Sequence, residues 1–259
     1  MSVLDSIVAG VREDLAVRMA GVTYSEVERA ALDAPAALDP MPAFRTPGLA
    51  VIAEVKRRSP SKGDLAPIPD PASLAASYAA GGAAAISCLT EERRFGGTLA
   101  DLDAVRGRVR IPVLRKDFMV DDYQFFEARA HGADLVLLIV AALDDIELDR
   151  FLRLSTDLGM TALVETHTEE EVDRALAAGA ELIGVNNRNL KTLQVDIATF
   201  AGLSERIGDK AVRVAESGIL SPAEAHRVAR EGADVILVGE ALVRHIDPAA
   251  AIQEMTGLR

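Results

Sequence analysis

Charged side chains follow several short apolar runs of this chain, and their types suit acid–base chemistry. The run VIAEV contains Glu54 and leads to Lys56, VLRK ends in Lys116, and TALVE ends in Glu165. Lysine can donate a proton and glutamate can accept one when the surroundings adjust their pKa values. A buried lysine or glutamate without a partner is costly, so we expect these groups to lie together and to neutralise one another.

Two further runs carry polar groups at the same relative position. LIGVNNR contains Asn186 and Arg188, and VRVAE ends in Glu216. Residues two apart on a strand point to the same face, so Asn186 and Arg188 form one pair of this kind and Glu54 and Lys56 another. A structural ring of salt bridges is the alternative interpretation. Such rings more commonly lie at the solvated bottom of a barrel, and they need no phosphate loop beside them.

Glycines at two turns indicate a phosphate site. ESG follows one apolar run at 216–218, and VGE follows the last run at 238–240. Backbone N–H groups of Gly218, Gly239 and Glu240, with the Ser217 hydroxyl, are suitable donors for an anion. Either glycine alone is weak evidence, since glycine also ends strands. The loop RRSPSKG after Lys56 is either an exposed connection or a mobile lid that brings Ser59 over the ligand.

The apolar runs themselves predict the fold. Runs of five or six Val, Ile, Leu and Ala residues indicate strands buried on both faces, which are typical of parallel sheets. Helical segments separate them, and several helices end in a Gly-Ala-Asp or similar sequence that marks the return to a strand. The eight predicted strands span about 49–55, 83–88, 111–115, 134–139, 161–165, 181–186, 211–216 and 234–239. We therefore predict an α/β fold, a (β/α)8 TIM barrel with its active site at the C-terminal ends of the strands.

Residues 1–48 precede the first predicted strand and form a helical extension of the barrel. Apolar residues at positions 3, 4, 7, 8, 11 and 15 follow helical spacing. The extension either caps the bottom or side of the barrel or crosses its mouth and contributes to the site. Residues 49–259 are predicted to form the barrel as one catalytic domain.

Composition narrows the class of function. The net charge of −12 argues against a nucleic-acid or anionic-membrane partner, although a small anionic substrate remains compatible with it. One cysteine, Cys88, excludes an internal disulfide and favours a cytoplasmic location. No apolar stretch is long enough to span a bilayer. The four histidines have no metal-ligand spacing, so we predict no metal and no cofactor.

Six segments together resemble the indole-3-glycerol phosphate synthase family of tryptophan biosynthesis. They are IAEVKRRSPSKG, LRKDFMVDDYQ, LVETHTEEE, IGVNNRNLKTLQVD, VAESGI and VGEAL. The resemblance runs in order from about Val51 to Leu242. It implies a cytoplasmic carboxy-lyase, free of cofactor, that closes the ring of 1-(2-carboxyphenylamino)-1-deoxyribulose 5-phosphate with loss of carbon dioxide and water. Its partner would be this phosphosugar, and the chain would be a monomer or a weak dimer.

The resemblance also implies roles. Lys116 matches the general acid and Glu165 the general base, with Lys56 and Glu54 in support. The residues that would bind the substrate are Asn186, Arg188, Glu216, Phe95, Phe118 and Leu190. Those that would hold the phosphate are Ser59, Ser217, Gly218, Gly239 and Glu240. Some family members carry a small hydroxyl residue where this chain has Glu240, so we expect its carboxylate to turn away from the phosphate.

Two other classes of function remain. One is a different phosphate-binding barrel, such as an isomerase of an aminated phosphosugar, which would share the two glycine turns but not need the lysine, glutamate, asparagine and arginine set. The other is a metabolite-binding scaffold without turnover. Formation of an indole product distinguishes the synthase from both.

Overall fold

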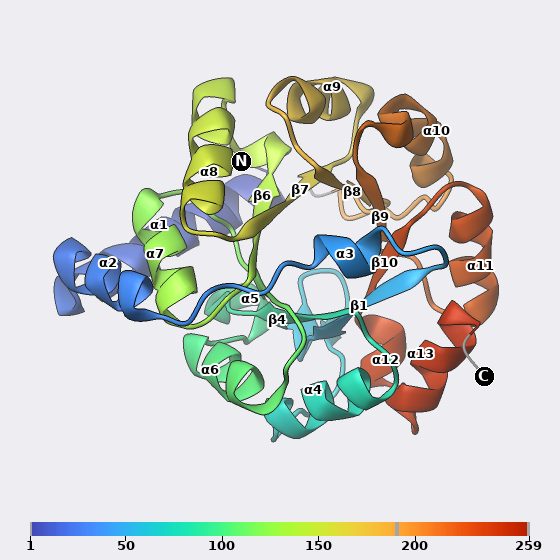
Figure 1. Ribbon diagram of the computed structural model, residues 1–259, viewed down its shortest axis with the longest axis horizontal. Coiled ribbons are helices and arrows are strands. Elements are labelled where there is room, and N and C mark those ends of the chain that lie inside the picture. Colours follow the sequence, from blue (N-terminus) through green and yellow to red (C-terminus); the bar gives the residue numbers. More distant parts are fainter. Residues whose placement is uncertain (1, 190–191, 258–259) are drawn as a thin grey trace.

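The computed structural model describes residues 2–189 and 192–257, and eight of its strands close into a parallel barrel (Figure 1). They are β1 (Ala50–Val55), β4 (Ala85–Leu89), β5 (Val113–Lys116), β6 (Leu135–Ile139), β7 (Thr161–Thr166), β8 (Leu182–Asn186), β9 (Val212–Glu216) and β10 (Val235–Val238). The predicted barrel is confirmed, and the strand ends fall within two residues of the predicted ones. Lys116 was placed just after its strand but still belongs to it, because it pairs with Leu89 of β4.

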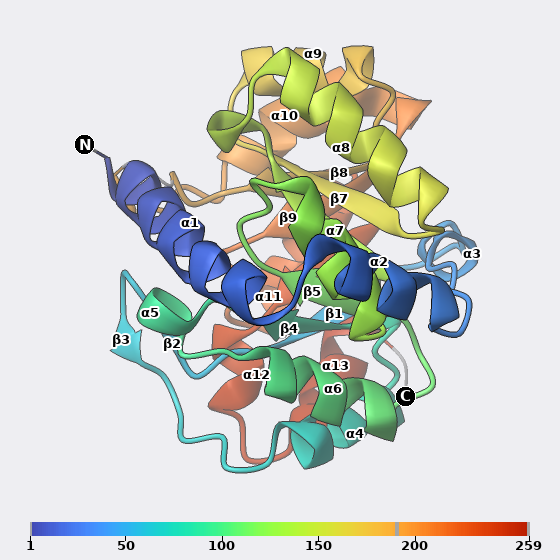
Figure 2. The ribbon, with the colours of Figure 1, turned by 90° about the vertical axis from the view of Figure 1, so that its left-hand side faces the viewer.

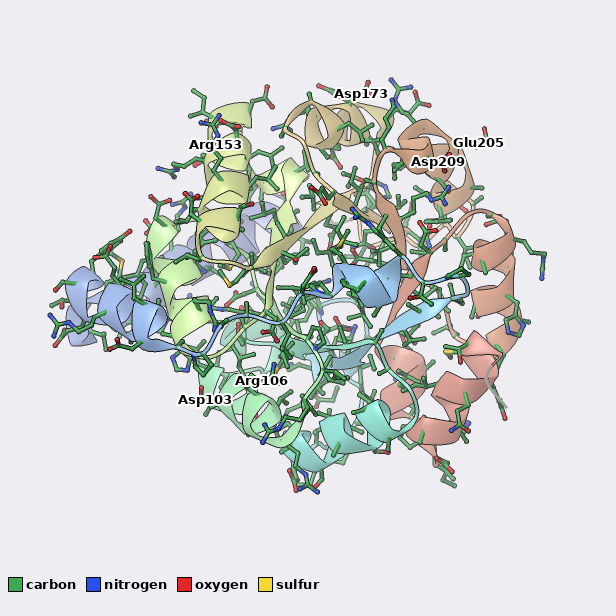
Figure 3. All side chains as sticks on the ribbon, viewed as in Figure 1. Asp103, Arg106, Arg153, Asp173, Glu205 and Asp209 are labelled. Carbon is green, nitrogen blue, oxygen red and sulfur yellow. The ribbon has the colours of Figure 1, made fainter. Side chains whose placement is uncertain are left out.

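Helices form a ring outside the strands (Figure 1). The main ones are α4 (Pro71–Ala80), α6 (Leu99–Arg108), α7 (Asp122–Ala130), α8 (Asp145–Asp157), α9 (Glu169–Ala177), α10 (Thr199–Ile207), α11 (Pro222–Arg230) and α13 (Pro248–Thr256). Short elements at the connections are α5 (Glu92–Phe95), α12 (Glu240–Val243), the 3-10 turns η1 (Val140–Ala142) and η2 (Gly208–Lys210), and the hairpin β2 (Arg58–Ser59) and β3 (Gly63–Asp64). Charged side chains such as Asp173 of α9 lie on the outer surface of this ring (Figure 3).

Side chains fill the barrel interior in layers of four, each contributed by alternate strands, as in other barrels of this type. One apolar layer consists of Ile52, Leu114, Leu163 and Val214. The next layer toward the C-terminal mouth consists of Ser87, Leu137, Gly184 and Leu237. In the strand register these residues pair with residues of the apolar layer below or of the layer above. The layer at the C-terminal mouth consists of Glu54, Lys116, Glu165 and Glu216. The strand register therefore gathers four ionisable groups directly above an apolar core.

The N-terminal extension consists of α1 (Val3–Gly21), α2 (Tyr24–Asp33) and α3 (Met41–Phe44). Helix α1 lies on the same side of the barrel as the β2–β3 hairpin, and α3 lies at the opposite end (Figure 2). Leu4, Ile7 and Val11 of α1 pack in one cluster with Phe118 and Ile139 at the strand ends. Of the two placements considered from the sequence, α1 thus takes the path across the mouth, while α3 lies near the bottom.

Asp134, just before β6, is a buried junction at the bottom of the barrel. Its carboxylate accepts hydrogen bonds from the Arg106 guanidinium at 2.5 Å and from the backbone N–H groups of Val113 and Leu38, each at 2.8 Å. Arg106 lies at α6 in Figure 3. One side chain therefore joins α6, β5 and the segment that follows α2.

We predict that Asp134→Ala lowers the free energy of unfolding by about 3 kcal/mol, because Arg106, the buried N–H of Val113 and the N–H of Leu38 lose their acceptor. Urea unfolding followed by circular dichroism measures the loss. Asp173→Ala is the control, since Asp173 is exposed and pairs with Arg206 on a neighbouring helix at the surface. An equal shift in both variants would contradict the assignment of Asp134 as a buried junction.

Candidate active site

A single cavity at the C-terminal mouth brings the predicted site residues together. Of those proposed from the sequence, it is lined by Glu54, Lys56, Ser59, Phe95, Lys116, Phe118, Glu165, Asn186, Arg188, Glu216, Ser217, Gly218, Gly239 and Glu240. Leu190 lies outside the described residues. The strand ends and the loops that follow them therefore converge on one space, as the sequence predicted.

Lys116 is at the centre of the charged layer. Its Nζ lies 3.1 Å from Oε2 of Glu216 and 3.4 Å from Oε2 of Glu165. Asn186 donates a hydrogen bond from Nδ2 to the other Glu165 oxygen at 2.9 Å. Glu54 forms a direct ion pair with Lys56. The carboxylates are almost fully buried, whereas the Lys116 side chain is 12% exposed to the cavity.

Burial and mutual charge set the protonation of this cluster. Burial raises the pKa of Glu216 to about 8; the Glu165 charge adds to the rise, and Lys116 opposes it. Burial alone would lower the pKa of Lys116, but the carboxylates of Glu216 and Glu165 outweigh it and raise that pKa. The pKa of Glu54 is lowered because Lys56 and Lys116 outweigh the effect of its burial. Lys116 therefore carries a proton that it can donate, and Glu216 carries one at neutral pH.

Two glycines make room for the carboxylates. A Cβ at Gly184 would overlap Oε1 of Glu216, and one at Gly239 would overlap Oε2 of Glu54. Oε1 of Glu216 and the Ser87 hydroxyl in the layer below are buried and have no hydrogen-bond partner among the described residues, whereas Oε2 of Glu54 is the oxygen that pairs with Lys56. Gly184 and Ser87 were not identified from the sequence as part of the site. The only signal for Gly184 is a glycine inside an otherwise apolar strand.

The loops after β9 and β10 form the other side of the cavity. Ser217 and Gly218 both have left-handed backbone, with φ values of 62° and 78°. For Ser217 this conformation costs on the order of 1 kcal/mol, and such strain concentrates at functional sites. Oε1 of Glu240 forms an ion pair with Nη1 of Arg244 at 3.2 Å, one helical turn along α12. The carboxylate of Glu240 is thus held by the cation of the residue that directly follows α12.

Apolar side chains form the remaining walls. The rings of Phe95 and Phe118 lie 6.1 Å apart between centroids. Leu4 and Ile7 of α1 line the same cavity and pack in one cluster with Phe118, against which Phe95 also packs. Their role was not predicted residue by residue, although the helical spacing of apolar residues near the N-terminus was the available signal. The cavity therefore combines a charged floor, a polar side and an apolar side.

Arg188 is held by its own loop rather than by a carboxylate. Its Nη1 donates to the Leu193 carbonyl at 3.0 Å, and its backbone N–H donates to Oδ1 of Asn186 at 2.9 Å. Burial lowers its pKa, and the nearby carboxylate of Glu240 opposes this effect. Arg188 thus presents a cation at the mouth without a salt-bridge partner of its own among the described residues.

Among residues 2–189 and 192–257, no group of three or more His, Cys, Asp or Glu side chains has an arrangement that could hold a metal ion. Within the same residues, no helix is both long and apolar enough to cross a membrane.

The fold and the cavity define a (β/α)8 barrel with a cluster of lysine and carboxyl side chains at its C-terminal mouth. Residues 4–255 match the family model described as indole-3-glycerol phosphate synthase, and the chain belongs to this family. An indole-3-glycerol phosphate synthase of a Nocardioides species is 62% identical over 258 residues, covering 100% of this chain and 99% of the relative. One from Mycolicibacterium gilvum is 59% identical and covers 98% and 93%.

Solved structures that are more distant in sequence share the barrel. A 3-hexulose-6-phosphate synthase is similar with a TM-score of 0.65 at 18% identity, covering 82% of this chain and 99% of that one. A second such synthase, from Salmonella typhimurium, gives a TM-score of 0.66 at 17% identity, covering 81% and 97%. At this level of identity the likeness concerns the fold alone.

We predict that Glu216 is protonated at pH 7 and loses its proton as the pH rises through about 8. Since its pKa in the folded state exceeds the ordinary value of 4.5, the folded protein binds an additional proton between these two pH values. The stability that Glu216 contributes is therefore present at low pH and lost as the pH approaches 8. Infrared difference spectra should show a protonated carboxyl band at pH 7.

The assignment of that band requires matched variants. Glu216→Gln should remove it, and Glu54→Gln should retain it because Glu54 is ionised. A band that survives in Glu216→Gln would show that another carboxyl group carries the proton.

Proposed function

We propose that the protein converts 1-(2-carboxyphenylamino)-1-deoxyribulose 5-phosphate into indole-3-glycerol phosphate, with release of carbon dioxide and water. The observation that carries this proposal is the position of Lys116. It is a protonated lysine in a buried layer, in contact with two carboxylates, at the floor of a cavity that also has apolar walls and glycine turns. Family membership supports the same reaction.

Ring closure requires an acid. The ring carbon that bears the carboxylate attacks the ketone carbon, and the ketone oxygen gains negative charge. Lys116 donates a proton to this oxygen, and its raised pKa ensures that it is charged at the start. Loss of carbon dioxide leaves its bonding electrons with the ring and restores aromaticity. Proton donation of this kind typically contributes about two to four powers of ten to the rate.

Dehydration requires an acid and a base together. The hydroxyl formed in the first step departs as water after it receives a proton, and the new five-membered ring loses one proton. Glu165 accepts that proton, held in orientation by the amide of Asn186. Lys56, held by Glu54, is suited to supply the proton to the leaving hydroxyl, because its side chain remains partly exposed to the cavity.

The other residues bind the substrate. Gly218, Gly239 and the Glu240 backbone, with Ser217 and Ser59, surround the phosphate. Arg188 pairs with the substrate carboxylate before it is lost, and Glu216 accepts or donates a hydrogen bond at a sugar hydroxyl. Phe95 and Phe118 pack against the anthranilate ring. We further propose that α1 closes the mouth over the ring, with Leu4 and Ile7 as contacts.

The location and partners that we propose for the enzyme rest on its cysteine content and net charge. A reducing cytoplasm suits a chain with one cysteine, and Cys88 is fully buried. The acidic net charge makes nucleic acid and anionic membranes unsuitable partners. We propose that the chain works as a monomer or a weak dimer and needs no cofactor or metal.

We predict that Lys116→Ala lowers the turnover number by about two to four powers of ten, because the ketone oxygen loses its acid. The assay follows indole fluorescence during turnover of the carboxyphenylamino substrate, and the chain has no tryptophan to add background. Lys210→Ala, in the exterior turn η2, is the control and should keep full activity. If the wild type bound this compound but gave no indole signal, the true substrate would be another phosphosugar.

We predict that Glu240→Ser changes the Michaelis constant little, by less than about threefold, because the carboxylate pairs with Arg244 and only the backbone N–H faces the phosphate. Steady-state kinetics of the purified variant provide the measurement. A large change in the Michaelis constant would show instead that the Glu240 side chain contacts the substrate.

A further inference from the structure

A second set of buried charges lies outside the barrel wall, directly behind the charged layer. Arg115 precedes Lys116 on β5, so its side chain points to the opposite face, toward α7, where it is 1% exposed. Its Nη2 donates to Oδ2 of Asp117 at 3.0 Å and to Oε2 of Glu127 at 2.9 Å. Its other donors reach the Gln124 carbonyl and the Thr90 hydroxyl. None of these groups takes part in the proposed chemistry.

Asp117 connects this set to the site. Its Oδ1 accepts a hydrogen bond from the N–H of Phe118 at 2.8 Å, and its Oδ2 accepts one from the Thr90 hydroxyl at 2.6 Å. The backbone N–H of Thr90 in turn donates to the carbonyl of Lys116 at 3.2 Å. Asp117 therefore fixes the backbone on both sides of the turn at which Lys116 and Phe118 point into the cavity.

The outer end of the set reaches the N-terminal helix. Arg18 of α1 donates from Nε and Nη2 to the two oxygens of Glu127, at 2.7 and 3.2 Å. Leu15 of α1 packs in the same region with Tyr123 and Phe126 of α7. The opposite end of α1 carries side chains that line the cavity. A continuous chain of charged contacts thus joins α1 to the end of β5.

The desolvation cost of burying these charges indicates that they serve a purpose other than stability. Desolvation of buried ions is expensive, and well-packed apolar residues of similar volume are often at least as stabilising. A guanidinium instead provides geometric order, because its planar set of N–H donors fixes the positions of several acceptors at once.

We propose that Arg115 and Glu127 are positioning residues, which with Arg18 hold Lys116 and Phe118 in a fixed relation to α1. The inference rests on the proposed role of Lys116 as the acid.

The decisive experiment separates stability from position. In Arg115→Met/Glu127→Leu, apolar groups replace both members of one buried ion pair, so the urea midpoint should fall less than in Arg115→Met alone, although Asp117 also loses its contact with Arg115. The turnover number, corrected for folded protein, should fall about tenfold or more, because small displacements of a catalytic group are costly. Amide hydrogen exchange should accelerate at residues 116–120. Arg115→Met alone should lower the midpoint as well, because Glu127 loses its buried partner.

Arg106→Met is the matched control. It also removes an arginine from a buried carboxylate, that of Asp134, but at the bottom of the barrel. It should lower the midpoint and leave turnover and exchange at residues 116–120 unchanged. Arg18→Met removes only the link to α1 and should lower turnover about threefold, whereas Arg18→Lys should recover most of it.

The outcomes are distinct. Normal turnover and normal exchange in the double variant would overturn the positioning role. If the double variant does not fold, Glu127→Gln keeps the volume but replaces one of the two acceptor oxygens with a donor group, and the same two readouts decide. If the wild type forms no indole product, the proposed function fails, and amide exchange at residues 116–120 still tests whether the network orders the turn.

Discussion

The charged layer at the mouth of the barrel is the constraint on which the other features depend. Three carboxyl groups, of which that of Glu216 is protonated, and one ammonium group lie in one layer above an apolar core, and β1, β5, β7 and β9 supply them. None of them could be buried alone without a large cost. They are tolerated as a set because Lys116 contacts two of the carboxylates, Lys56 pairs with the third, and burial keeps Glu216 protonated. The protonation states suited to acid–base chemistry thus result from the packing itself.

The layer also determines which residues can surround it. Gly184 and Gly239 are required because carboxylate oxygens occupy the space of a Cβ. The apolar layers below exclude water from one side, and α1 with Phe95 and Phe118 restricts it from the other. In such surroundings each charge interacts more strongly than it would in water. The N-terminal helix is therefore as much a part of the electrostatic environment as the strands that carry the charges.

The sequence predicted the barrel and nearly all of the candidate site because both depend on local patterns. A strand buried on both faces is continuously apolar, and a polar residue at its end is visible without any tertiary information. Contacts between residues of different strands, which depend on the stagger of the strands in the barrel, could not be predicted from the sequence. Nothing in the sequence shows that Lys116 contacts Glu216, 100 positions away, or that Gly184 must be small because Glu216 reaches it. The path of α1 was likewise undecided, since an amphipathic helix fits either end of a barrel.

The neighbouring residues Arg115 and Lys116 show a second limit on what the sequence alone can predict. Both are cations in the same motif, and composition alone cannot separate them. The alternation of a strand sends Lys116 into the cavity and Arg115 into the layer between barrel and helices. One position along the chain therefore separates a group that can donate a proton from one whose contacts order the turn beside it. Asp134, at the other end of the neighbouring strand, joins its elements just as firmly but lies away from the cavity. Buried charges of similar geometry thus stabilise the fold at the bottom of this barrel and position the site residues at its mouth.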